Sequence, residues 1–423
     1  MKRFLSLFIA LCSVAAAGAQ SAEFFKNIDP YYYLEIYRPY PSEMASNVTP
    51  APKGYEPFYI SHLGRHGSRY NILVHQYEKP LEVFGAAHEA GELTETGERF
   101  YAEWRKIAAE AKDRYGDLSE LGFAEHRGIA HRMYESYPEV FSTKGGRHCR
   151  VNCKSTVVPR CILSMSAFTQ ELVRLSPGID VSMEASAANA KFLAAYAGLN
   201  LVNDKAKPLS DSICRANMPD ASRFLDNLFR KGSRVREEMI GDAGDFMYDM
   251  YLGNAILGKE GKTLDYLFTE DELCELWKAS NLRRYILTGP SKIFLDAILA
   301  GAKEMVRNVI AHADKAIATG DEQATLRFAH DVTMIPFVTM MGIPCGSLIT
   351  DDYSTVCANW QCSVVTPMAS NVQLIFFRNK AGDILVKVLF CEREQRLVEA
   401  VGEPVNGCYY RWADLRKFLE SQL

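Results

Sequence analysis

Three short apolar segments, each followed by a polar turn and then by helical sequence, constrain the fold of this chain more than any other feature. Residues 58–63, 151–153 and 324–329 have the length and composition of buried strands. Strands that alternate with helices are typical of an α/β domain, in which helices cover a sheet. We therefore predict a mostly parallel central sheet flanked by helices.

The stretch between the second and third of these segments has a different character. Alanine-rich and amphipathic segments in residues 185–310 predict helices only. After the third strand, residues 372–377 and 384–390 are apolar runs separated by turn residues, which predicts a hairpin. We expect an α/β core formed by residues 58–184 and 311–423, with residues 185–310 inserted as a helical subdomain.

The N-terminus has the composition of a secretory signal. A basic start at Lys2 and Arg3 precedes an apolar run, and Ala17-Gly18-Ala19 fits the pattern of small residues at a cleavage site. We predict a cleaved signal peptide at residues 1–19, cut after Ala19, and a secreted or periplasmic protein. Residues 20–57, rich in Tyr, Pro and Ser, are expected to form an irregular arm. The apolar run is too short to span a bilayer comfortably, and no membrane partner is expected.

Net charge limits the classes of partner. The chain has 48 Lys and Arg against 52 Asp and Glu, a formal net charge of −4. Proteins that bind nucleic acid usually carry an excess of positive charge, so we expect no nucleic-acid partner. An anionic ligand would then require basic residues that are concentrated in one place.

Cysteine and histidine spacing gives little support for a metal site. Ten of the eleven cysteines remain after the predicted cleavage, and an even number in an exported protein permits disulfides. The spacings Cys149-x3-Cys153 and Cys357-x4-Cys362 lack the tight pairs of a zinc ribbon. His62 shares a strand face with a second histidine, but no third ligand lies near it in the sequence. We expect disulfides or buried thiols, a packing role for His62, and no metal.

The turn after the first strand concentrates positive charge around one histidine. In Arg65-His66-Gly67-Ser68-Arg69, two arginines flank His66. Guanidinium groups match phosphate oxygens and keep their charge, whereas a histidine between them is disfavoured as a cation. His66 is therefore a candidate nucleophile for an electrophilic phosphorus. Gly67 is expected to let the backbone approach a ligand closely. A surface turn without function would explain this motif equally well if it stood alone.

Two further motifs follow the other strands. Ser155 and Thr156 lead into a helix that carries Arg160 in its first turn, and helix N-termini attract anions. His330-Asp331 follows the third strand, and a histidine beside a carboxylate can bind a phosphate oxygen and protonate a leaving oxygen. Helix capping alone would also explain Asp331. Functional loops gather at the carboxyl ends of strands in open α/β sheets, so the three motifs are expected to meet.

In combination these motifs resemble the histidine acid phosphatase family, a branch of the histidine phosphatase superfamily. The resemblance extends from about residue 58 to residue 400 and rests on the following segments: Arg65-His66-Gly67-Ser68-Arg69, Leu93-Thr94-Glu95-Thr96-Gly97, Ser155-Thr156 with Arg160, Ser166-Ala167-Phe168, and His330-Asp331. It implies an α/β sheet domain with a helical insert, which agrees with the fold predicted above.

The resemblance also implies a role for each matching residue. His66 would attack phosphorus and become phosphohistidine, and Asp331 would protonate the leaving group. The phosphoryl oxygens would be held by four residues: Arg65, Arg69, Arg160 and His330. No cofactor would be required, and the pH optimum would be acidic. The expected partner is a small phosphorylated substrate, acted on by a monomer or homodimer.

The substrate class is less determined than the reaction. Residues 360–377 and 386–390 look similar to the tail of multiple inositol polyphosphate phosphatases. Those proteins usually carry His-Ala-Glu-Thr, where this chain has Asp331 and Val332 in place of Ala and Glu. Phytate-like substrates therefore stay open as one class. Two alternatives are a phosphotransferase or mutase that uses the same phosphohistidine, and a protein of this fold that binds phosphorylated ligands without cleaving them.

Overall fold

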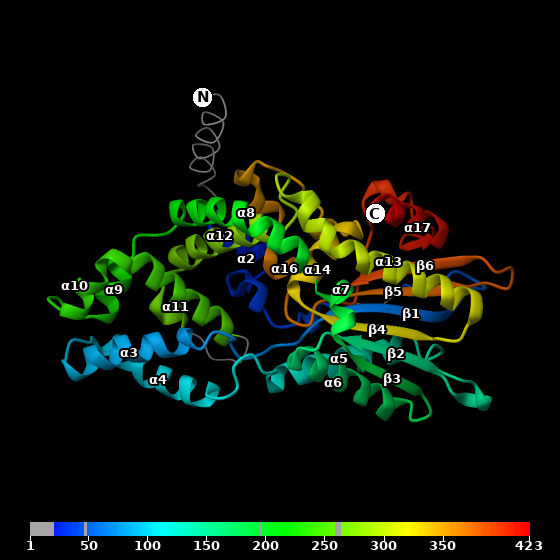
Figure 1. Ribbon diagram of the computed structural model, residues 1–423, viewed down its shortest axis with the longest axis horizontal. Helices are drawn as coiled ribbons and strands as arrows, with labels where there is room; N and C mark the ends of the chain where they lie inside the picture. Colours follow the sequence, from blue (N-terminus) through cyan, green and yellow to red (C-terminus); the bar gives the residue numbers. More distant parts are fainter. Residues whose placement is uncertain (1–20, 46–48, 195, 259–263) are drawn as a thin grey trace.

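The computed structural model of the protein describes residues 21–45, 49–194, 196–258 and 264–423 (Figure 1). The predicted signal peptide at residues 1–19 lies outside the described residues. No helix in these described ranges is long and apolar enough to cross a membrane.

An eight-stranded mixed sheet forms the centre of the α/β part, in the order β3-β2-β4-β1-β5-β6-β7, with β8 paired to β6. Its strands are β1 Glu56–Arg65, β2 Arg150–Ser155, β3 Asp180–Ala185, β4 Ala324–Ala329, β5 Asn371–Arg378, β6 Ile384–Phe390, β7 Arg393–Glu394 and β8 Tyr409–Arg411. The three predicted strands and the predicted hairpin are confirmed as β1, β2, β4 and the pair β5–β6.

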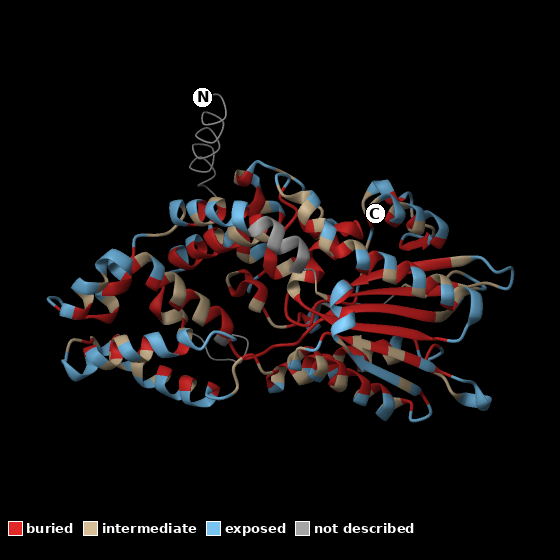
Figure 2. Cartoon of the chain, in the orientation of Figure 1, coloured by how far each residue is buried: buried red, intermediate tan, exposed pale blue. Residues whose placement is uncertain are grey.

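The direction of the strands determines at which edge of the sheet the candidate site lies. The neighbouring strands β3, β2, β4 and β1 are parallel, whereas β5 to β8 pair in antiparallel fashion beside them. Opposite Arg65 at the end of β1 lies Ala329 at the end of β4. The chain therefore leaves both strands at the same edge of the sheet. Strand β4 is buried along its whole length because it lies between β2 and β1 (Figure 2).

Helices cover both faces of the sheet (Figure 1). The helices of this part are α5 Glu120–Ser136, α6 Pro159–Leu175, α13 Leu295–Thr319, α14 Asp331–Met340 and α17 Trp412–Ser421. Helices α5 and α6 pack on each other, and α6 contacts β2 and β4. Helices α13 and α14 contact β1 on the opposite face. The predicted fold class is thereby confirmed.

A helical region lies at the end of the molecule away from the hairpin (Figure 1). Its helices are α3 His75–Glu89, α4 Glu95–Ala111, α8 Tyr196–Ala216, α9 Ser222–Leu228, α10 Arg234–Met239, α11 Ala243–Gly258 and α12 Glu270–Leu287. Helix α4 packs on α9, and α3 packs on α10. The helical region therefore combines α8 to α12 with two helices that precede β2 in the chain. Thr94 caps α4, because its hydroxyl accepts a hydrogen bond from the Gly97 amide at 3.1 Å.

Short elements complete the chain. They include the helices α2 Ala22–Ile28, α7 Ala190–Leu193, α15 Val356–Asn359 and α16 Cys362–Val365, and the 3-10 helix η1 Tyr32–Tyr37. The N-terminal arm thus holds a regular helix and η1, which packs against α11, α12 and α16. This packing joins the arm to the helical region.

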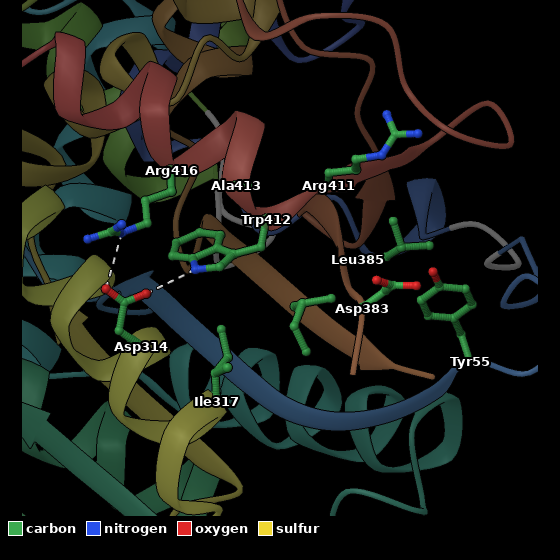
Figure 3. A pocket seen from close by; sticks show the side chains of 10 residues that line it. Tyr55, Asp314, Ile317, Asp383, Leu385, Arg411, Trp412, Ala413 and Arg416 are labelled. Atoms are coloured by element: carbon green, nitrogen blue, oxygen red, sulfur yellow. Dashed lines mark hydrogen bonds and ion pairs between the residues drawn. The ribbon is translucent and has the colours of Figure 1, made fainter. Parts of the chain in front are cut away.

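The sheet end opposite the site holds a cavity of about 700 Å³. It is lined by Tyr55, which precedes β1, and by residues of β6, α13 and α17. Asp314 accepts a hydrogen bond from the Trp412 indole at 3.0 Å and pairs with Arg416 at 3.2 Å (Figure 3). These two contacts join α17 to α13 and hold the C-terminal helix in place.

Candidate active site

Two histidines meet where β1 and β4 end. The His66 amide donates a hydrogen bond to the Ala329 carbonyl at 3.0 Å, and the Ala369 amide donates to the His66 carbonyl at 3.1 Å. These bonds fix the backbone that follows β1 against the end of β4 and the segment before β5. The rings of His66 and His330 lie 5.6 Å apart, centroid to centroid, at an angle of 68°. Segments 264 residues apart in sequence therefore contribute to one site, as their positions at strand ends predict.

The loop after β1 is anchored by a buried carboxylate that the sequence analysis did not identify. Glu125, in α5, accepts hydrogen bonds from the Ser68 amide at 2.7 Å and from the Ser68 hydroxyl at 2.9 Å. It also accepts one from the Tyr40 amide at 2.9 Å. The Gly67 amide donates to the Ser164 hydroxyl of α6 at 3.1 Å. Helices α5 and α6 thus hold the loop that carries His66.

Gly67 has a packing role that the sequence did not indicate. A Cβ at this position would lie 2.7 Å from the Gly122 carbonyl oxygen and 2.8 Å from its Cα. A Cβ on Gly122 would in turn lie 2.2 Å from the Ser68 carbonyl oxygen. The two glycines allow the loop and α5 to touch backbone to backbone. Close approach to helix α5 is therefore one constraint at Gly67, and its predicted approach to a ligand stays a prediction.

Part of the Arg65 guanidinium makes no hydrogen bond to the described residues. Its side chain is fully buried, and Nη1 donates to the carbonyls of Ile36 and Thr366, the latter at 2.7 Å. Nε and Nη2 have no hydrogen-bond partner among the described residues. Burial lowers the pKa of Arg65 to about 10, so the group is still a cation at neutral pH. A buried cation with unsatisfied N–H groups requires an acceptor, and an anionic oxygen would provide it.

Two further arginines come from different segments. Arg69 is buried, donates from Nη1 to the Tyr70 carbonyl at 2.9 Å, and lies over the Tyr37 ring at 5.6 Å. Arg160 lies in the first turn of α6, next to Pro159. Both affect His66, whose pKa lies well below its usual value because of burial and the charges of Arg65, Arg69 and Arg160. His66 is consequently a neutral imidazole in a field of positive charge.

His330 is buried beside the start of α6. Its Nε2 lies 3.2 Å from the Thr156 hydroxyl and 3.7 Å from the Cys161 sulfur. Burial, followed by the charge of Arg160, lowers the pKa of His330 to about 4. His330 is therefore neutral near pH 7, and an anion placed between it and Arg160 would favour its protonated form.

Asp331 is the first residue of α14, and the N-cap position belongs to His330, whose side chain makes no capping bond. Helix capping therefore does not explain this carboxylate. Its Oδ2 lies 3.8 Å from Nη1 of Arg284. Burial raises the pKa of Asp331, but the guanidiniums of Arg65 and Arg284 outweigh burial and hold the pKa at about 2. Arg284 comes from α12 and links the helical region to the site.

The structure brings all the predicted site residues into one electrostatic cluster. They are His66, Asp331, Arg65, Arg69, Arg160 and His330. Their catalytic and binding roles stay predictions. Three further residues of the site were not predicted: Arg284, Glu125 and Tyr37. Each lies within a helical or 3-10 segment that has no local motif, so no pattern in the sequence could have identified it.

A cavity of about 460 Å³ adjoins this cluster, and we call it the side cavity. It shares two residues with the site: Arg284, the partner of Asp331, and Tyr37, which lies below Arg69. The rest of its lining comes from α11, α12 and the segment that contains Leu73 and Gln76.

Of the two expectations for the cysteines, disulfides or buried thiols, the described residues show thiols. All ten are free thiols, nine of them buried and Cys345 half-buried. An even number of cysteines says nothing about the distances between them, and these side chains fill the core as small apolar groups. In the part of the chain that the structure describes, no three His, Cys, Asp or Glu side chains form a group that could hold a metal.

Comparison with known sequences identifies no family: no family model matches the chain, and no curated protein matches it. Similarity appears at the level of structure.

The protein is similar to the multiple inositol polyphosphate phosphatase of Bifidobacterium longum in complex with inositol hexasulfate. The TM-score is 0.77 at 19% identity, covering 92% of this chain and 97% of that one. The phytase from D. castellii gives a TM-score of 0.63 at 12% identity, covering 93% and 85%. Hafnia alvei phytase in complex with myo-inositol hexakis sulphate gives 0.56 at 13% identity, covering 88% and 98%.

These structural neighbours match the family that the motifs resemble. Because the identities are below 20%, the likeness establishes the arrangement of the chain and not its substrate. The protein therefore has the histidine phosphatase-like fold that is seen in multiple inositol polyphosphate phosphatases and phytases.

Proposed function

We propose that the protein hydrolyses phosphate monoesters through a covalent phosphohistidine at His66. The observation that carries this proposal is the buried imidazole of His66 within a cluster of three guanidiniums from two chain segments, which lower the pKa of His66. A cationic imidazole could not attack phosphorus, and an isolated neutral one would not attract a phosphate dianion. The cluster provides both the nucleophile and the charge that holds its target.

Binding of the phosphoryl group uses the cations that surround His66. Arg65 offers Nε and Nη2, which have no hydrogen-bond partner among the described residues. Arg69 and Arg160 add positive charge from the loop and from the start of α6. His330 gains a proton more easily once a dianion is present, because the anion offsets the nearby arginine charges. The same groups stabilise the charge that develops on the oxygens in the transition state.

The tautomer of His66 determines which nitrogen attacks. Nδ1 lies 3.0 Å from the Gly67 carbonyl oxygen, which can only accept a hydrogen bond. The proton therefore resides on Nδ1, and the lone pair on Nε2 is available. Nε2 forms a bond to phosphorus while the bond between phosphorus and the ester oxygen breaks. The electron pair of the broken bond stays on the ester oxygen.

Asp331 provides the proton that the leaving oxygen needs. In the second step, water attacks the phosphohistidine, the Asp331 carboxylate takes one proton from that water, and the bond between phosphorus and nitrogen breaks. Phosphate and neutral His66 result. A carboxyl with a pKa of about 2 is ionised in the free protein at moderate pH. A bound dianion offsets the arginine charges and raises this pKa, so the donor gains its proton together with substrate.

The structural neighbours support a small phosphorylated substrate. Two of them are phytases and one is an inositol polyphosphate phosphatase. Export is part of the same proposal and rests on residues 1–19. Expression of the full chain in a bacterial host, followed by N-terminal sequencing, should give Gln20 as the first residue. A mature chain that begins at Met1 in the cytoplasm would contradict export.

The test of activity is release of inorganic phosphate from p-nitrophenyl phosphate, glycerol 3-phosphate, a hexose phosphate and phytate, from acidic to neutral pH. His66→Ala should abolish release. His88→Ala is the matched control, because His88 is an exposed histidine paired with Glu98 at 2.7 Å, in α3. A labelled protein that keeps phosphate in alkali and loses it in acid would identify phosphohistidine. Absence of release from every ester would favour the binding-protein alternative.

A further inference from the structure

The N-terminal arm contributes to the candidate site through η1. Its Ile36 carbonyl accepts a hydrogen bond from Nη1 of Arg65, and its Tyr37 ring centroid lies 5.6 Å from the guanidinium carbon of Arg69. Glu35 directly precedes these two residues, and η1 packs against α12. The proposed reaction assigns no role to the Glu35 carboxylate.

The environment of Glu35 is unusual for a charged residue. Glu35 is fully buried, and neither carboxylate oxygen accepts a hydrogen bond from the described residues. Its backbone has φ 54° and ψ −138°, a conformation that residues other than glycine rarely adopt. An ionised carboxylate without hydrogen bonds is costly to bury unless a cation offsets its charge. An ionised Glu35 therefore depends on a nearby cation.

Arg284 provides this cation and connects Glu35 to Asp331. Burial raises the pKa of Glu35, and the charge of Arg284 is the largest of the effects that oppose burial. Nη1 of the same guanidinium lies 3.8 Å from Oδ2 of Asp331. Burial lowers the pKa of Arg284, but the charges of Asp331 and Glu35 outweigh burial and raise this pKa. One guanidinium therefore interacts with two carboxylates, one from η1 and one from α14.

We propose that Glu35 is a positioning residue that acts through Arg284 on the proposed proton donor Asp331. This inference rests on the proposed function, because it concerns the donor of the same reaction. If Asp331 were the only partner of Arg284, the guanidinium would favour the ionised carboxylate, which has no proton to donate. Glu35 offsets part of the Arg284 charge, so Asp331 gains a proton more easily when the phosphate dianion binds.

Other titratable groups surround the two carboxylates. The groups that interact electrostatically with Glu35 come from the helices around η1 and, besides Arg284, include Arg283, Tyr248, Tyr251, Cys214 and Cys362. Burial raises the pKa of these tyrosines and thiols, so they are neutral in acidic and neutral solution. Asp331 also interacts with Arg65, Arg69 and His330. A comparison of a Glu35 variant with the wild-type protein leaves all of these groups in place.

The test follows kcat against pH for an alkyl ester, glycerol 3-phosphate or a hexose phosphate, whose leaving oxygen needs a proton. Glu35→Gln removes the negative charge and keeps the length of the side chain. That charge favours the protonated form of Asp331, so its removal should lower the pKa of the donor. The alkaline limb should move to lower pH by about one pH unit, the effect of unit charges roughly 10 Å apart at an effective dielectric constant of about 20.

Three further variants make the test specific. Glu43→Gln is the matched control, because Glu43 is an exposed residue of the same arm that lies 3.8 Å from Arg38; its limb should coincide with that of the wild type. Glu35→Met removes the same charge with a flexible apolar side chain and should give the same shift, which keeps the test decisive if Glu35→Gln does not fold. In an Arg284→Gln background, Glu35→Gln should leave the limb where Arg284→Gln alone places it.

The outcomes separate the two proposals. A shift to lower pH that requires Arg284 supports the inference. A limb that Glu35→Gln and Glu35→Met leave in place or move to higher pH overturns it and leaves the phosphatase intact, whatever the thermal unfolding curves show. An equal shift with and without Arg284 also overturns it, because Glu35 would then act on Asp331 directly. No release by the wild-type protein from any ester of the activity test overturns the proposed function and this inference with it.

Discussion

Substitution of Gly67 by alanine tests whether the loop carrying His66 is held by direct backbone contact. The new Cβ would lie 2.7 Å from the Gly122 carbonyl oxygen, whereas ordinary contact begins at 3.4 Å. The loop or α5 would therefore have to move by about 0.7 Å. Both partners are backbone atoms, so no side-chain rotation can relieve the clash. The Ser68–Glu125 hydrogen bonds tie the loop to the same helix and oppose the movement.

The expected cost follows from this displacement. Overpacking of this kind destabilises a protein by roughly 1–3 kcal/mol. A shift of about 1 Å in a reacting group can cost about 100-fold in rate. His66 directly precedes Gly67, so Gly67→Ala should lower kcat by about one to two orders of magnitude and lower the melting temperature by several degrees.

The assay measures kcat with p-nitrophenyl phosphate, and the melting temperature by circular dichroism. Gly241→Ala is the matched control, because a Cβ there has nothing within 4 Å. Its kcat and melting temperature should stay close to those of the wild type. If Gly67→Ala also keeps wild-type kcat and melting temperature, the loop does not touch α5 as described and the argument fails.

Three other outcomes are expected. Asp331→Asn should slow release of alkyl esters far more than release of p-nitrophenyl phosphate, because only the poor leaving group needs a proton; equal losses would remove Asp331 from the donor role. Arg284→Gln removes a cation that lowers the pKa of Asp331, so this pKa should rise. The alkaline limb of the pH–activity profile, where Asp331 loses its proton, should then move to higher pH; an unchanged limb would contradict the pairing. Burial lowers the pKa of His62 to about 3, so the unfolded state binds more protons below the usual pKa of 6.5. The free energy of unfolding should then fall by roughly 3 kcal/mol between about pH 7 and pH 4.5 on account of this group, and urea titrations of His62→Gln should show a correspondingly weaker pH dependence.

The parts of the fold that the sequence predicted are those with buried, apolar strands. β1, β4 and the β5–β6 hairpin were identifiable because burial on both faces requires apolar runs. Strand β3 was not predicted, because it is an edge strand, paired only with β2 and exposed over most of its length. Its segment Asp180–Ala185 therefore shows no apolar pattern.

The same distinction holds for the site. His66 and His330 were predicted to meet because each follows a parallel strand, and local sequence marks such positions. Glu125 and Arg284 lie inside helices α5 and α12, where only tertiary packing turns one face toward the site. The local sequence also could not show whether Asp331 caps a helix, because the answer depends on the residue at which α14 begins.

The central position of β1 has a consequence for how the protein reaches its native state. Its neighbours are β4 and β5, so Arg65 faces Ala329 and Gly64 faces Asn371. Closure of such long loops is slow, and pairing cannot begin until most of the chain has been synthesised. The loop that carries His66 can therefore take its final position only after β4 and β5 have paired with β1. A nascent or truncated chain that lacks β5 would contain Arg65 and Arg69 without the strand pairing that holds them beside His330.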